Sequence, residues 1–97
     1  MNFGAVQTSE DLVTVLEQLN EAFKRAENEG ILPEEIATDA QYNLTKGIQQ
    51  ARKPDPDKKS IVGYLTKAKT LVDAVPAATA LAQALTHVIP TVHKLLL

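Results

Sequence analysis

Apolar side chains recur every three or four residues along most of this chain, which is the period of an amphipathic α-helix. The first apolar stripe is formed by Leu12, Leu16, Leu19, Phe23 and Ala26. Thr8 and Ser9 precede the stripe with hydroxyl groups that cap free backbone amides, and Gly30 follows it and suits the left-handed conformation that ends many helices. This pattern predicts a helix over residues 10–29.

A second stripe begins after Pro33, which suits the first position of a helix because no hydrogen bond is lost there. The apolar residues of this stripe are Ile36, Ala40, Leu44, Ile48 and Ala51. Gly47 lies on the same face and weakens a helix by up to ~1 kcal/mol relative to alanine, so we expect a neighbouring helix to approach closely there. The pattern predicts a helix over residues 33–51.

Pro54 and Pro56 interrupt the periodicity, because a proline inside a helix removes a backbone hydrogen bond. Asp55 and Pro56 match the N-cap and the first position of a new helix. The third stripe consists of Ile61, Leu65, Ala68, Val72 and Val75. We therefore predict a third helix from Pro56 to about Val75.

The last helix follows Pro76, at which the chain restarts or kinks, and it is rich in alanine. Its buried side is expected to hold Ala78, Leu81, Leu85, Val88, Val92 and Leu96. Pro90 lies well inside this segment and removes the hydrogen bond to the carbonyl of Thr86. We expect either a kink at Pro90 or two short helices.

The predicted helices are joined by connections of a few residues, so consecutive helices are expected to lie antiparallel beside one another. The chain of 97 residues is long enough for one domain and no more. The predicted fold class is therefore all-α. We expect a single domain over residues 1–97, an antiparallel up-down-up-down four-helix bundle with a proline-kinked last helix.

The composition excludes several classes of chemistry. The chain has no cysteine, and so has no disulfide, thiol nucleophile or cysteine zinc site. His87 and His93 are six residues apart, about 240° around a helix, so they cannot share one metal ion unless the helix breaks. Carboxylate pairs such as Glu34 and Glu35 lack the cleft that acid–base catalysis needs. We expect no enzyme activity, no cofactor and no bound metal.

The chain also lacks the pattern of a membrane-spanning or nucleic-acid-binding protein. Its last third is mostly apolar, but the run is interrupted by Asp73, Gln83, His87, His93 and Lys94. A pI of about 5.6, with only Tyr64 among the lysines, argues against nucleic-acid binding. Residues 1–9 do not resemble a sorting signal, so we expect a soluble cytoplasmic protein. Contact of the last helix with a membrane, or its sharing with a second copy of the chain, stays open.

Charge is distributed unevenly along the chain, although the net charge is only −2. Residues 1–51 carry nine acidic and three basic side chains, whereas residues 52–97 carry three acidic and seven basic ones. These halves can pack together within one molecule, or they can form complementary patches that attract a different molecule. Both alternatives predict sensitivity to salt, but only the second predicts assembly.

A longer segment resembles a known family. The residues that carry the resemblance are Lys53-Pro54-Asp55-Pro56-Asp57-Lys58-Lys59, then Ile61-Val62-Gly63-Tyr64-Leu65 with Ala68, then the alanine-rich last helix, and before them Leu32-Pro33-Glu34-Glu35. Residues 31–97 resemble the effector-associated or death-like adaptor domains of bacterial conflict (immune-like) systems. The resemblance implies a non-enzymatic module, found beside TIR domains, caspase-like proteases and NTPases, that brings an effector to its sensor by like-with-like contacts.

Charge and resemblance together suggest a protein–protein adaptor or self-association module. Its partner would be the same or a related helical domain, with a homo-oligomer possible; the alternative is a membrane-active domain that uses its apolar C-terminal helix. The predicted basic set is Arg52, Lys53, Lys58, Lys59, Lys67 and Lys69. The predicted acidic set is Glu10, Glu17, Glu21, Glu27, Glu34 and Glu35.

Overall fold

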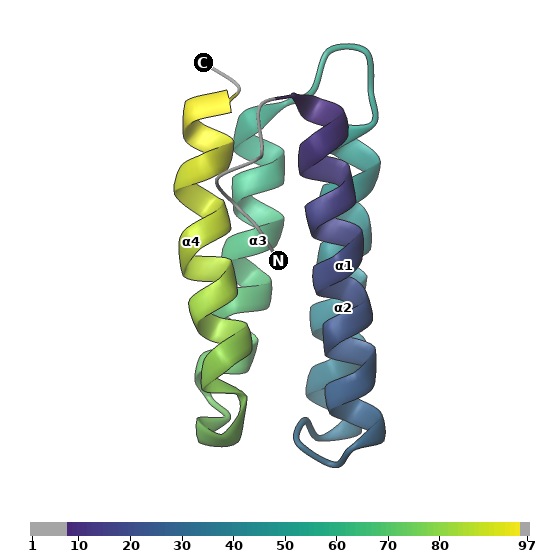
Figure 1. The fold of residues 1–97 in the computed structure, drawn as a ribbon, viewed down its shortest axis with the longest axis vertical. Coiled ribbons are helices and arrows are strands. Elements are labelled where there is room, and N and C mark those ends of the chain that lie inside the picture. Colours follow the sequence, from purple (N-terminus) through teal and green to yellow (C-terminus); the bar gives the residue numbers. More distant parts are fainter. Residues whose placement is uncertain (1–7, 96–97) are drawn as a thin grey trace.

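The computed structural model describes residues 8–95, and within this range the chain forms four α-helices and one turn of 3₁₀-helix, with no strand. The elements are α1 (Ser9–Asn28), α2 (Glu34–Ala51), α3 (Lys58–Asp73), the 3₁₀ turn η2 (Pro76–Ala78) and α4 (Thr79–Leu95). The helices lie side by side along the longest dimension of the molecule, 36 Å (Figure 1). The α1–α2 and α3–α4 connections lie at one end and the α2–α3 connection lies at the other. The predicted all-α class is confirmed.

The start and end of α1 follow the predicted capping signals. The hydroxyl oxygen of Thr8 accepts a hydrogen bond from the backbone N–H of Asp11 at 3.1 Å. At the other end Gly30 has a φ of 76°, and the N–H of Ile31 donates to the carbonyl of Ala26 at 2.8 Å. Together these features form a Schellman-type helix end, which needs a residue that tolerates a positive φ. Both bounds of α1 fall one residue earlier than predicted.

The predicted start of α3 was wrong. Asp57, not Asp55, is the N-cap residue, because its carboxylate accepts from the backbone N–H of Lys59 at 3.1 Å and from the hydroxyl of Ser60 at 2.8 Å. Pro56 therefore lies in the connection rather than in the first turn. Asp55 and Asp57 each follow a proline, but only Asp57 is followed three residues later by a hydroxyl side chain, that of Ser60.

The predicted end of α2 at Ala51 is confirmed, and the start of α2 and the end of α3 differ from the predictions by one or two residues. α2 begins at Glu34, with Pro33 at the N-cap position and no side-chain cap. α3 ends at Asp73 rather than Val75, since a residue before proline is disfavoured in the α conformation, and Val75 is extended at φ −116° and ψ 99°.

α4 continues without interruption through Pro90, so the alternative of two short helices is wrong. A kink at this proline stays a prediction. Leu96, which was expected on the buried side of this helix, lies outside the described residues.

The core consists mainly of the predicted apolar stripes. Its largest fully buried side chains are Phe23, Leu12, Leu16, Leu19, Leu44, Ile61, Leu65, Leu85, Val72, Val88 and Val92. Ile36, Val75 and Leu81 were expected in the same core, but they are only partly buried, and Val75 lies beyond the end of α3. α2 packs on both α1 and α3, whereas α4 packs mainly on α3.

Gly47 lies against α3, but the two helices are not so close there that a glycine is required. A methyl group added there would lie 3.8 Å from Cδ2 of Leu65 and 3.8 Å from Cβ of Tyr64. These are ordinary van der Waals distances, so the packing leaves room for alanine.

Candidate interaction surface

The described part of the chain offers no assembled metal site and no membrane span. Among residues 8–95, no three His, Asp or Glu side chains are placed to hold a metal ion. Likewise, no helix in that range has both the length and the apolar character needed to cross a bilayer.

The predicted basic residues do not form one continuous surface. Four of them, Arg52, Lys53, Lys58 and Lys59, lie in the α2–α3 connection and the first turn of α3, at one end of the molecule. Asp55 and Asp57 are interleaved with these four bases in the sequence and reduce their net charge.

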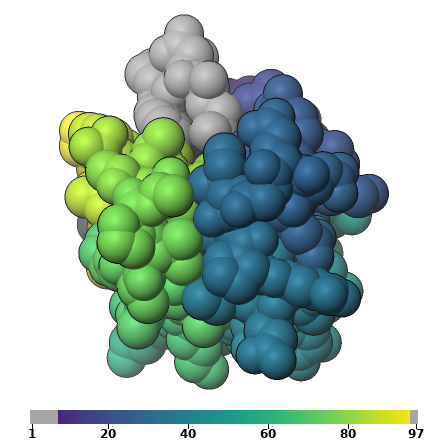
Figure 2. All heavy atoms as spheres, turned by 90° about the horizontal axis from the view of Figure 1, so that it is seen from below, coloured from purple at the N-terminus to yellow at the C-terminus, as the bar shows by residue number. Residues whose placement is uncertain are grey.

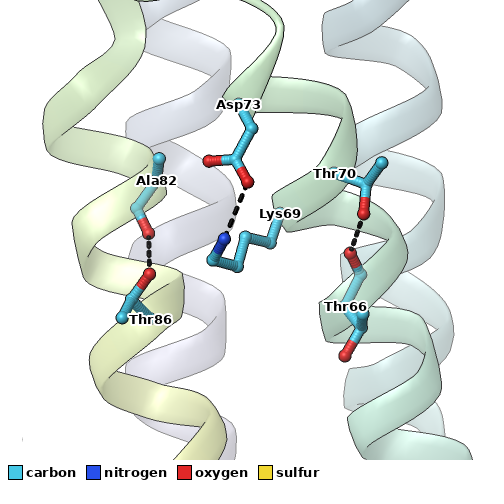
Figure 3. A network of polar contacts seen from close by, with 6 residues as sticks. All are labelled: Thr66, Lys69, Thr70, Asp73, Ala82 and Thr86. Carbon is cyan, nitrogen blue, oxygen red and sulfur yellow. Dashed lines mark hydrogen bonds and ion pairs between the residues drawn. The ribbon is translucent and has the colours of Figure 1, made fainter.

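The remaining two bases lie on different sides of α3. The ammonium nitrogen of Lys67 is 5.7 Å from the centroid of the Tyr64 ring, a cation–π contact. The ammonium nitrogen of Lys69 is 2.7 Å from a carboxylate oxygen of Asp73, and Figure 3 shows this pair between α3 and α4. Lys69 is thus paired within its own helix.

The predicted acidic residues fall into two groups. Glu10, Glu17 and Glu21 are exposed along the outer face of α1. Glu27 lies in the last turn of α1, while Glu34 and Glu35 open α2. The second group therefore lies at the end of the molecule opposite the four clustered bases.

One acidic and one basic member of the predicted sets meet within the molecule. Oε2 of Glu17 lies 2.6 Å from Nη2 of Arg52, and the two side chains are 51% and 57% exposed. Such an exposed pair contributes only about 0–1 kcal/mol to stability. Glu17 and Arg52 thus form an ion pair within one molecule, which was the first of the two alternatives for the oppositely charged halves. Within residues 8–95, the other five predicted acidic residues form no ion pair.

The pKa of Asp57, the N-cap residue of α3, is shifted by its hydrogen bonds. The hydrogen bond from the Ser60 hydroxyl, together with the backbone N–H groups of Ser60 and Lys59, lowers the pKa of Asp57 below its ordinary value of 3.8. Asp57 is therefore held as a carboxylate for capping and is not poised for proton transfer near neutral pH.

A groove lies between α2 and α3, and of the residues that line it only Lys67 belongs to the predicted sets. The groove has a volume of about 400 Å³ and is lined by Asp39, Tyr42, Asn43, Thr66, Lys67, Thr70 and Leu71. Tyr42 is 60% exposed, and the ammonium of Lys46 lies 5.5 Å from the centroid of its ring. A signal was present in the sequence, because Tyr42 stands about 200° around the helix from the buried positions Ala40 and Leu44.

Comparisons of the chain with protein-family models, with curated proteins and with solved structures find no match. The resemblance of residues 31–97 to bacterial adaptor domains therefore stays a prediction from the sequence.

Proposed function

We propose that the chain is a non-enzymatic protein–protein interaction module, an adaptor or self-association domain that couples an effector to a sensor or partner. The observation that supports this proposal best is the separation of the predicted charges along the long axis. Glu27, Glu34 and Glu35 lie at one end of the molecule, and Lys53 and Lys59 lie at the other. Among residues 8–95, none of these five side chains forms an ion pair.

Unpaired charges of opposite sign at two ends favour contact with a complementary surface on another molecule. Such charges guide diffusional encounter and select partners more than they add affinity. In the proposed contact, the acidic end of one domain meets the basic end of the same or a related helical domain. This arrangement is heterologous, because each molecule contributes a different end to the contact.

The proposal also assigns an up-down-up-down order to the four helices and a kink to Pro90. Connections at alternating ends support that order. Pro90 supports the kink, because it lacks the N–H that would bond to the carbonyl of Thr86.

The alternative function, membrane contact through α4, has less support. The apolar residues Leu85, Val88 and Val92 of α4 are fully buried in the core. Its outward positions include Gln83 and His87, which are exposed. A surface-bound helix needs an apolar face that is free to enter the lipid, and here that face is occupied.

Light scattering of the double variant Lys53→Glu/Lys59→Glu tests the proposal. This variant is expected to lower the average mass at a given concentration, because two bases at the basic end become acids. Helicity by circular dichroism is expected to stay unchanged, since both residues are exposed and acids favour a helix N-terminus.

The matched control is Lys24→Glu/Arg25→Glu, which changes the charge equally at the acidic end. It is expected to keep the wild-type mass or raise it, provided that its circular dichroism shows a folded helix. Equal masses for wild type and Lys53→Glu/Lys59→Glu would contradict the charge mechanism.

A further inference from the structure

The groove between α2 and α3 combines exposed apolar surface with two charges of opposite sign. Tyr42 on α2 is 60% exposed, and Leu71 on α3 is only partly buried, although both are large apolar side chains. Tyrosine is enriched in protein interfaces because its ring is large and rigid and its hydroxyl tolerates water. The groove is shallow and open, which suits a protein surface better than an enclosed small molecule.

Two polar side chains in the groove, those of Thr70 and Asn43, have hydrogen-bond partners in their own helices. The hydroxyl of Thr70 donates to the carbonyl of Thr66 at 3.0 Å (Figure 3). The side-chain amide of Asn43 donates to the carbonyl of Asp39 at 2.8 Å. Covering these groups with a partner costs less free energy than covering donors that rely on water.

The two charges lie on opposite walls of the groove. Asp39 belongs to α2 and Lys67 belongs to α3. Within residues 8–95, neither side chain forms an ion pair, and the ammonium of Lys67 lies over the ring of Tyr64. One patch that carries both an acid and a base is complementary to itself under a two-fold axis, because each acid then faces the base of the other copy.

We propose that the α2–α3 groove is a homodimer interface, in which Asp39 of each copy pairs with Lys67 of the other and Tyr42 and Leu71 supply the apolar contact. This inference rests on the proposed interaction function and names a second copy of the chain as its partner. A stable interface buries about 800 Å² per partner, roughly one seventh of the 5649 Å² of exposed surface. The outer faces of α2 and α3, with 18 and 16 residues, are long enough to supply that area.

Reciprocal charge reversal with a mixing experiment tests the groove. Light scattering over a wide concentration range is expected to find a dimer of the wild-type chain. Asp39→Lys and Lys67→Asp are each expected to raise the dimer dissociation constant about tenfold or more, because the two-fold axis then opposes like charges twice. An equimolar mixture of the two variants is expected to form a heterodimer, and the double variant is expected to dimerise again.

Matched controls lie outside the groove, in the α2–α3 connection and on α1, at exposed residues of neither predicted set. Asp55→Lys and Lys24→Asp change the charge by the same amounts and are expected to dimerise as the wild type does. Tyr42→Ser is expected to weaken the dimer without changing any charge. Circular dichroism checks that each variant keeps its helices.

The outcomes separate this inference from the proposed function. A wild-type chain that stays monomeric, or that dimerises equally well with Asp39→Lys and Lys67→Asp, overturns the groove interface. Dissociation by Lys53→Glu/Lys59→Glu alone would also overturn the groove, yet it would support the charge-separated module. Dissociation by the groove variants alone supports the groove and contradicts the role proposed for the two ends.

Discussion

At the scale of single residues, the three described glycines in or beside the helices have different roles. Gly30 has a φ of 76°, so Gly30→Ala is expected to lower the free energy of unfolding by about 1–2 kcal/mol.

Gly47→Ala places its methyl in ordinary contact and is expected to raise the free energy of unfolding by about 0.5–1 kcal/mol. A methyl group at Gly63 would have no atom within 4 Å, so Gly63→Ala is expected to raise the free energy of unfolding by the same amount. Urea denaturation measures all three, and destabilisation by Gly47→Ala would contradict the described packing.

Asp57 gives a prediction about pH at the same scale. Because the pKa of Asp57 is lowered on folding, its cap adds stability above pH 3.8, and that stability is lost as the pH falls through the lowered pKa. Ser60→Ala removes the first cause of the shift, so the pKa of Asp57 is expected to rise towards 3.8. An NMR titration of the Asp57 carboxyl group measures this change. An unchanged pKa would show that the backbone N–H groups, rather than the Ser60 hydroxyl, stabilise the carboxylate.

A helix boundary can be predicted from the sequence when few neighbouring residues are suited to the capping position. The candidate caps at the start of α1, Thr8 and Ser9, are adjacent, and Gly30 was the one candidate at its end, so both ends of α1 were predicted to within one residue. Asp55 and Asp57 compete for the cap of α3, and the hydrogen bond from Ser60 decides between them. Propensity alone does not rank two aspartates that each follow a proline.

At the scale of elements, α4 contains an exposed proline within a continuous helix. Pro90→Ala is expected to raise the free energy of unfolding by about 1–3 kcal/mol, because alanine restores the hydrogen bond to Thr86 and favours the helix. Thermal and urea unfolding measure the change. A loss of stability would mean instead that a bend at Pro90 is needed to bury Val88 and Val92.

Helix faces could be predicted from the sequence because the apolar period defines the buried side of each helix without reference to the others. The groove could not be predicted from the sequence, because it depends on which side of α2 packs against which side of α3. Asp39 and Lys67 are far apart in the sequence, and only the packing of the two helices brings them to one hollow.

At the scale of the whole molecule, the uneven charge along the chain becomes a separation in space. The acidic α1–α2 connection and the basic α2–α3 connection lie at opposite ends because α2, with 18 residues, stands between them. The two halves of opposite sign therefore do not neutralise each other. Among residues 8–95, Glu17 and Arg52 are the one ion pair that joins the two predicted sets. The Lys53→Glu/Lys59→Glu variant changes the charge at one end of the molecule, whereas the groove variants change the charge on the side of the bundle.

Short connections also have a consequence for how quickly the chain reaches its native state. Among the described residues, the strongest packing joins helices that are neighbours in the sequence, and the α1–α4 contact, which joins distant segments, is lighter. Seen from below, the blue α1–α2 end of the chain lies beside the green α3–α4 end (Figure 2). Closing the six residues 52–57 brings α2 onto α3 at a small cost in chain entropy. A topology of such local contacts places the chain among fast-folding helical bundles, which reach the native state in about microseconds to milliseconds.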